Sequence, residues 1–228
     1  MLARFPLLAP MMLTALALPA SKAAAAQFPL PQRPVAPVVS PEWSNEMARD
    51  KVGEALDVIR IAGITRGMTV ADIGSGSGYY AIRVAPVVGA RGRVLAQDID
   101  ARTLQLLERR AQKAKLNNVV PVLGNGANAR IPLFSTDVAI MAHMYHEIAQ
   151  PYQLLDKLRR SLRPGGRLVV VDLDRPSEQH GMPKALLVCE VKSVGYDLVS
   201  MTDITQGYVA VFYPGKRPDP ATVRACRP

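Results

Sequence analysis

The sequence is poor in cysteine and in aromatic residues. Among its 228 residues it has two cysteines, Cys189 and Cys226, one tryptophan and 5% aromatic residues. Neither cysteine has a partner at metal-ligand spacing, so a cysteine-based metal site is not expected. If the protein is exported, the pair can form one disulfide. The alternative is a buried Cys189 in a helix and a free Cys226 near a loose tail, and the sequence leaves both open.

Acidic residues are absent before Glu42. Arg4 is followed by an apolar run at residues 7–18, which is shorter than the ~20 residues needed to span a bilayer. A proline then ends the run, and small residues that fit an A-x-A cleavage pattern follow it. We therefore expect residues 1–26 to be an export signal and the mature protein to be periplasmic. A mitochondrial transit peptide and a misassigned start codon are alternatives, and without a functional leader the protein would be cytoplasmic.

Further long apolar runs are lacking, so no membrane span is expected in the mature chain. Residues 27–41 carry five prolines, which predicts an extended, semi-rigid linker without a core of its own. Residues 42–213 are predicted to be one domain with a substantial core. The proline-rich residues 214–228 are predicted to be an irregular tail.

The net charge of +9 raises the possibility of acidic or nucleic-acid partners. The lysines and arginines are scattered over predicted helices, as is usual for solvated helix faces. We therefore expect no nucleic-acid partner and a small-molecule substrate instead, and the sequence leaves the oligomeric state open.

Short apolar runs alternate with helical patterns after residue 42, which predicts a parallel sheet covered on both faces. The last two strands are close enough to pair as an antiparallel hairpin, and Pro121 favours an edge position or a kink for its strand. Helices are expected at about 52–62, 78–88, 101–115, 151–162 and 183–194. Strands are expected at 69–73, 93–97, 119–123, 137–143, 167–172, 196–202 and 208–213.

Ligands of such a sheet bind beyond the carboxyl ends of the strands. This rule predicts that four segments converge on one rim. They are residues 72–78, Asp98, residues 125–127 and residues 143–147.

The loop after the first strand lacks the third glycine of a dinucleotide-binding G-x-G-x-x-G motif, because Tyr79 occupies that position. A nicotinamide-dependent oxidoreductase is therefore disfavoured. Asp98 ends the second strand, where a carboxylate can accept hydrogen bonds from both ribose hydroxyls of an adenosine and would repel a 2′-phosphate. Asp100 is better placed to cap the next helix, which leaves Asp98 for a ligand.

Three segments together resemble class I S-adenosylmethionine (SAM)-dependent methyltransferases over about residues 46–213. They are VADIGSGSGY at 70–79, VLAQDID at 94–100 and LRPGGRLVVVD at 162–172. The resemblance implies an α/β, Rossmann-like seven-stranded sheet, mostly parallel with an antiparallel C-terminal strand and with helices on both faces. It also implies SAM as the cofactor.

The resemblance also implies which residues hold SAM. The first motif would hold the methionine part, through Asp72, Gly74, Ser75, Gly76 and Gly78. Asp98 would hold the ribose, with Ile99 against the adenine. Asn125 stands where the family often has an aspartate that contacts the adenine amino group, and Gly126 and Ala127 would line the adenine pocket.

Candidate catalytic groups follow the fourth strand in the segment AHMYHEI, residues 142–148. A base is needed only if the methyl acceptor must lose a proton, and His146 is preferred because histidine titrates near neutral pH. His143 and Tyr145 are the other candidates, although these side chains could instead close the SAM pocket or pack under the next helix. His143, His146 and Glu147 lack a further ligand at matching spacing, so no metal site is expected.

The leading hypothesis is a methyltransferase that acts on a small or medium-sized acceptor. The alternative is an exported methyltransferase-like binding module that has lost or repurposed catalysis, because SAM is made in the cytosol. A DPPY-type motif of amino-group methyltransferases is lacking, which argues against adenine-type acceptors, and export argues against a nucleic-acid methyltransferase.

Overall fold

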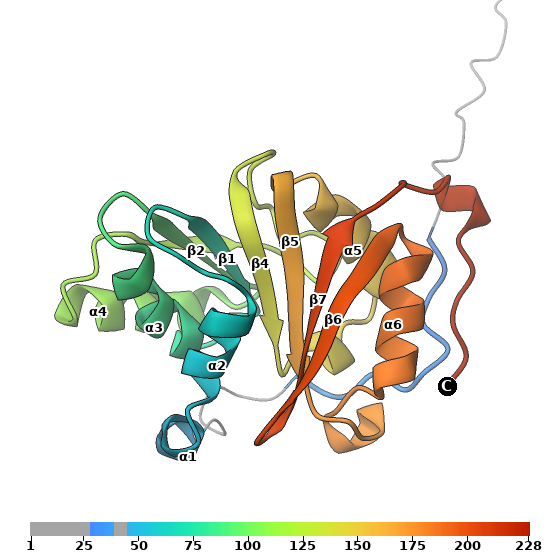
Figure 1. Ribbon diagram of the computed structural model, residues 1–228, viewed down its shortest axis with the longest axis horizontal. Coiled ribbons are helices and arrows are strands. Elements are labelled where there is room, and N and C mark those ends of the chain that lie inside the picture. Colours follow the sequence, from blue (N-terminus) through green and yellow to red (C-terminus); the bar gives the residue numbers. More distant parts are fainter. Residues whose placement is uncertain (1–27, 39–44) are drawn as a thin grey trace, which may run out of the picture.

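The computed structural model describes residues 28–38 and 45–228, so the predicted export signal lies outside the described residues. Seven strands form one sheet in the order β3-β2-β1-β4-β5-β7-β6 (Figure 1). Neighbouring strands from β3 to β5 are parallel, whereas β7 is antiparallel to both β5 and β6. The predicted fold class is confirmed. The strands are β1 (Thr69–Ile73), β2 (Arg93–Asp98), β3 (Val119–Leu123), β4 (Thr136–Ala142), β5 (Leu162–Asp172), β6 (Tyr196–Ile204) and β7 (Gly207–Pro214).

Pro121 lies in β3, which is an edge strand of the sheet. A proline has no backbone N–H to donate to a second neighbour, so the edge is where it fits. β5 begins five residues earlier than predicted, at Leu162, because its first residues pair with the start of β4 across a register shift. The glycine pair at 165–166 therefore lies inside a strand rather than in a turn.

The predicted helix over residues 52–62 is wrong at its start. Gly53 has a left-handed φ of 71°, which ends α1 (Glu46–Lys51) and begins α2 (Glu54–Ile61) at an angle to it (Figure 1). Leu56, which falls at helical spacing with the apolar residues Ala55 and Ile59, is nevertheless 73% exposed. The other helices are α3 (Tyr79–Val88), α4 (Ala101–Lys113), α5 (Pro151–Arg159) and α6 (Lys184–Ser193), with short 3-10 turns η2 (Tyr145–Glu147), η3 (Ser177–Gln179) and η4 (Pro220–Thr222).

The core has two layers, one on each face of the sheet. Alternate residues of β4 show the division, since Val138 and Ile140 pack with α2 and α3, whereas Ala139 and Met141 pack with α5 and α6. This period of two is expected for a strand that is buried on both sides. The helices thus cover both faces, as predicted, and leave the carboxyl ends of the parallel strands for a site. Within the described residues, no helix combines the length and the apolar character needed to cross a membrane.

Residues 28–38 contain neither helix nor strand, and they are not a free linker. Arg33 and Ala36 are buried against the domain, and the Arg33 guanidinium pairs with Glu190 of α6 at 3.2 Å. Arg33 also donates to the carbonyl oxygens of Tyr145 at 3.1 Å and His146 at 3.0 Å. This segment therefore fixes the backbone that follows β4.

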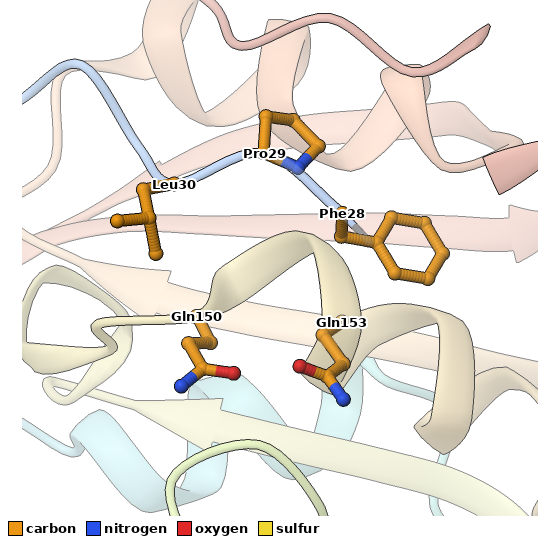
Figure 2. Close-up of a pocket in the computed structure, with 5 residues that line it drawn as sticks. All are labelled: Phe28, Pro29, Leu30, Gln150 and Gln153. Atoms are coloured by element: carbon orange, nitrogen blue, oxygen red, sulfur yellow. The ribbon is translucent and has the colours of Figure 1, made fainter. Parts of the chain in front are cut away.

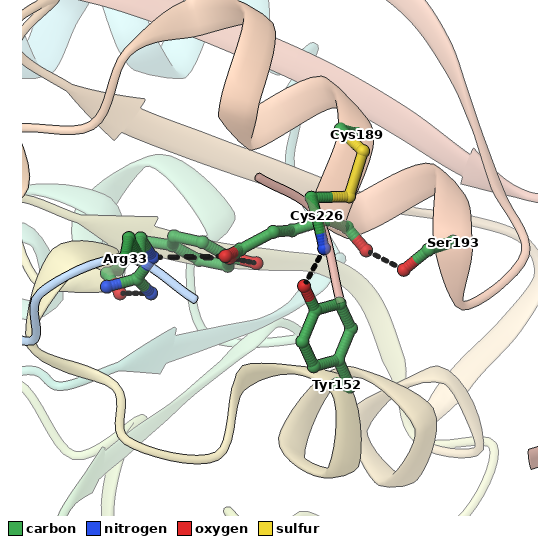
Figure 3. The surroundings of a disulfide bond; sticks show 7 residues. Arg33, Tyr152, Cys189, Ser193 and Cys226 are labelled. Atoms are coloured by element: carbon green, nitrogen blue, oxygen red, sulfur yellow. Dashed lines mark hydrogen bonds and ion pairs between the residues drawn. A yellow bond between two sulfur atoms is a disulfide. The ribbon is translucent and has the colours of Figure 1, made fainter. Parts of the chain in front are cut away.

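The C-terminal tail is irregular apart from η4, and it is tied to the domain. Cys226 forms a disulfide with Cys189 of α6, with Cα atoms 6.0 Å apart (Figure 3). The backbone N–H of Cys226 also donates to the Tyr152 hydroxyl at 2.8 Å. Of the two possibilities that the sequence left open, the structure shows the disulfide.

Candidate functional site

A cavity of about 1010 Å³ lies at the carboxyl ends of the parallel strands. The segments after β1, β2, β3 and β4 all line it, so the predicted rim exists. It also includes residues that were not predicted, from α1, from the start of α2 and from the loop after β5. The predicted site residues on its wall are Gly74, Ser75, Gly76, Asp98, Ile99, Asn125, Gly126, His143 and His146.

The glycine loop turns tightly enough to present its backbone to the cavity. Gly74 and Gly76 have φ values of 68° and 53°, a region that strongly favours glycine. A β-carbon at Gly74 would lie 2.9 Å from the side chain of Met144, so a larger residue would displace that side chain. Gly78 begins α3 behind the loop and is not on the cavity wall.

Asp98 connects the glycine loop to the end of β2. Its Oδ2 accepts the N–H of Gly76 at 2.9 Å, and its Oδ1 accepts the N–H groups of Ile99 and Asp100 at 2.7 and 3.0 Å. A carboxylate offers about four lone-pair sites, so Oδ2 keeps the capacity for one more donor. Asp100 caps α4 by accepting the N–H of Arg102 at 2.9 Å, as predicted.

Asp72 lies behind the loop and not on the cavity wall. It is 3% exposed, and its Oδ2 has no hydrogen-bond partner within the described structure. Burial raises the pKa of Asp72 to about 7, although a hydrogen bond from the backbone of Ala81 acts in the opposite direction. The Ser75 hydroxyl in the glycine loop is also buried without a partner within the described structure. Ser75 lies on the cavity wall, so its orphaned hydroxyl fits a polar ligand that completes its hydrogen bond.

The segment after β3 presents a small, open surface. Asn125 and Gly126 line the cavity, whereas Ala127 does not. The Asn125 Oδ1 already accepts the N–H of Ala127 at 3.1 Å, so it holds its own turn, and Gly126 has open space where a side chain would lie. The half-exposed Ile99 faces the same cavity from the end of β2. This part of the cavity wall therefore offers an apolar side chain and a glycine with open space beside it.

His146 is the best-oriented of the predicted catalytic residues. It is 2% exposed, and its Nδ1 lies 3.0 Å from Oδ2 of Asp172, which ends β5 in a fully buried position. The carboxylate fixes the ring and places the proton on Nδ1. The Nε2 atom is then the one left for the cavity.

His143 is held by a second buried carboxylate. Its backbone is in the left-handed region, with a φ of 53°, and its Nε2 lies 3.2 Å from Oε1 of Glu54. The same oxygen accepts hydrogen bonds from Arg49 at 2.6 Å and from the Tyr80 hydroxyl at 2.7 Å. Although burial acts to raise it, the hydrogen bonds from His143 and Arg49 lower the pKa of Glu54 to about 2. His143 is therefore part of an ion-pair cluster on the cavity wall.

Tyr145 is not a site residue, which corrects the prediction. It is fully buried away from the cavity, and its hydroxyl donates to Oε2 of Glu190 at 3.0 Å. Burial holds the pKa of Tyr145 well above its usual range. The one-residue step from Tyr145 to His146 in η2 turns the two side chains to different sides.

The structure also corrects the reasoning against a metal site. The sequence offered no further ligand beside His146 and Glu147, but the loop after β5 brings His180 to them. One potential ligand atom from each of the three lies within 4.8 Å of the others. Sequence reasoning missed His180, Glu54 and Asp172, although Asp172 could have been found because it ends a predicted strand as Asp98 does.

A second hollow, of about 330 Å³, lies between the start of the described chain and α5 (Figure 2). Its wall is Phe28, Pro29, Leu30, Gln150 and Gln153. None of these side chains titrates or acts as a nucleophile, so the chemistry belongs to the larger cavity.

The fold and the site are those of a class I SAM-dependent methyltransferase domain. The glycine loop follows β1, and the acidic residue Asp98 ends β2. A family model described as a methyltransferase domain matches residues 64–204. Because that match covers more than half of the chain, the protein belongs to this family.

Individual relatives agree with this assignment. A demethylmenaquinone methyltransferase of Listeria welshimeri is 25% identical over 121 residues, which are 53% of this chain and 51% of that protein. A ubiquinone/menaquinone biosynthesis C-methyltransferase of Azotobacter vinelandii is 30% identical over 120 residues, 52% of this chain and 47% of that protein. A SAM-dependent methyltransferase structure from Aquifex aeolicus superposes with a TM-score of 0.70 at 21% identity, covering 77% of this chain and 98% of that one. This chain thus matches about half the length of the Listeria and Azotobacter proteins.

Proposed function

We propose that the protein transfers a methyl group from SAM to a small or medium-sized acceptor bound in the 1010 Å³ cavity. The observation that carries the proposal is the hydrogen bond that the Gly76 N–H donates to Oδ2 of Asp98. This oxygen can accept a further hydrogen bond from a ligand. Asp98 would receive a ribose hydroxyl, the loop amides and Ser75 the methionine part, and Ile99 with Gly126 the adenine. SAM, when bound, supplies an electrophilic methyl group on a sulfonium.

The chain's own contribution is positioning and exclusion of water. Met144 packs over Gly74 and closes that end of the cavity. His146, oriented by Asp172, is the group that would receive a proton from an acceptor hydroxyl through Nε2. Ile148, Leu154 and Leu173 add apolar wall on this side, which suits an aromatic acceptor with a hydroxyl group. The Azotobacter vinelandii relative is named as a ubiquinone/menaquinone biosynthesis C-methyltransferase, so hydroquinones are the first acceptors to test.

The test is transfer of isotope-labelled methyl from SAM to a panel of phenols and hydroquinones, with S-adenosylhomocysteine measured in parallel. We expect labelled product with at least one acceptor, and its loss in Asp98→Ala. Binding of SAM without product on any acceptor would favour the alternative, a repurposed binding module.

We also propose that the protein works outside the cytoplasm. The Cys189–Cys226 disulfide supports this, because such bonds persist in oxidising compartments, and so does the leader-like composition of residues 1–26. A reporter fused behind residues 1–26 should leave the cytoplasm of a bacterial host. A reporter that stays inside would remove the localisation proposal without affecting methyl transfer.

A further inference from the structure

All three histidines of this chain, His143, His146 and His180, line the large cavity. His143 is engaged by Glu54. The other two, His146 and His180, lie with their rings edge to face, at a centroid distance of 5.5 Å. Glu147 adds a carboxylate, with Oε1 3.9 Å from Nε2 of His146. Two imidazoles and one carboxylate thus meet on the wall of the cavity.

We propose that His146, Glu147 and His180 bind a divalent transition-metal cation of the zinc type. Imidazole nitrogen with one carboxylate oxygen is a donor set for Zn²⁺ or Fe²⁺, whereas Mg²⁺ and Ca²⁺ prefer oxygen ligands. Three protein ligands leave at least one position of the cation open to the cavity. A water molecule or an acceptor oxygen would complete it.

The surroundings of His146 match those of a metal ligand. A ligating histidine usually donates its second ring N–H to a carboxylate, which fixes the tautomer and the ring orientation. Asp172 does this for His146, with Oδ2 3.0 Å from Nδ1. The fully buried Asp172 also accepts the N–H of Leu173 at 2.9 Å, so the orienting carboxylate is itself fixed.

His180 supplies the second, independent observation. Its Nδ1 is buried and has no hydrogen-bond partner within the described structure, which is costly unless a ligand satisfies it. Its backbone is in the left-handed region, with a φ of 56°, a conformation that for a residue with a β-carbon indicates local strain. Arg175 holds it there by donating to the His180 carbonyl at 3.1 Å.

Binding of a cation by His146, Glu147 and His180 can be measured without measuring methyl transfer. With a cation bound, Nε2 of His146 is a ligand rather than a base, and the cation itself would favour loss of the proton from a bound acceptor hydroxyl. Both cysteines form the disulfide, so no thiolate competes for zinc. This simplifies the measurement.

The test is calorimetric titration of the tag-free, chelator-treated full-length protein with Zn²⁺, supported by visible spectra of the Co²⁺ form. We expect one Zn²⁺ per chain, little heat with Mg²⁺, and affinity that falls by at least the 10–100-fold known for loss of an outer-shell partner in His180→Ala and in Glu147→Gln. His143→Gln is the matched control, because it removes a histidine of the same cavity outside the trio, and should retain stoichiometric binding.

Two results would overturn the proposal: no stoichiometric Zn²⁺ binding, or binding that His180→Ala and Glu147→Gln leave unchanged. Circular dichroism of each variant separates loss of the site from loss of the fold. SAM binding measured on the same samples reports the proposed methyltransferase function separately, since none of its predicted contacts comes from the trio.

Discussion

At the scale of single residues, the site contains several buried carboxylates, which are rare in the core of a stable protein. Glu54 and Asp172 are paired with histidines, and one oxygen each of Glu54 and Asp72 has no hydrogen-bond partner within the described structure. Such groups lower stability unless a ligand or a neighbour satisfies them. Their concentration around one cavity is therefore an argument for function.

Asp72→Asn is expected to change how stability depends on pH. The folded-state pKa of Asp72 is raised from 3.8 to about 7, mainly by burial. Between these values the folded protein keeps a proton that the unfolded chain has released, so this residue makes the wild type less stable as the pH rises. From pH 5 to pH 8 the variant should gain about 2–3 kcal/mol relative to the wild type in urea unfolding. A difference that does not vary with pH would contradict the raised pKa.

At the scale of secondary-structure elements, two irregular segments dock on the domain, and one of them holds the segment that carries His146. Residues 28–38 reach it through Arg33, and the tail reaches α5 and α6 through Tyr152 and the disulfide (Figure 3). The composition of both ends, rich in proline, predicted irregular chain and could not show this docking. The docking of residues 28–38 depends on the buried Arg33, and a single buried arginine leaves no periodic pattern in the sequence.

Arg33→Ala should destabilise the fold by about 3–5 kcal/mol, because it leaves the fully buried Glu190 without its cation. Burial already raises the pKa of Glu190, so neutralising that carboxyl should recover part of the loss. Chemical unfolding of Arg33→Ala, Glu190→Gln and the double variant measures this coupling. Additive effects of the two substitutions would show that the pair does not interact as described.

Removing the disulfide with Cys189→Ser and Cys226→Ser together should lower the free energy of unfolding. The bond closes a loop with a sequence separation of 37 residues, which in the chain-entropy model contributes about 4 kcal/mol. Urea unfolding with and without reductant is the measurement, and the double variant should not respond to reductant. Equal stability of the oxidised wild type and the variant would contradict this contribution.

At the scale of the whole molecule, the strand–helix order was readable because the parallel strands are mainly apolar and four of them, β1, β2, β3 and β5, end at or directly before a glycine or an aspartate. That pattern predicted the parallel sheet, the edge position of Pro121 and the rim that holds Asp98 and His146. It failed where the chain departs from local rules. Gly53 sets the start of α2 within one predicted helix and separates it from α1, which was not predicted, and Glu54 and His180 come to the cavity only through tertiary packing.

The central claim is that this cavity binds SAM through the glycine loop and Asp98. Isothermal titration calorimetry with SAM tests it directly on the purified wild type, on Asp98→Ala and on the control Asp100→Ala, which loses the cap of α4 at a cost of about 1 kcal/mol but keeps the loop contact. We predict micromolar-range affinity for the wild type and the control, and abolished or strongly reduced binding for Asp98→Ala. Equal heats for the wild type and Asp98→Ala would contradict it.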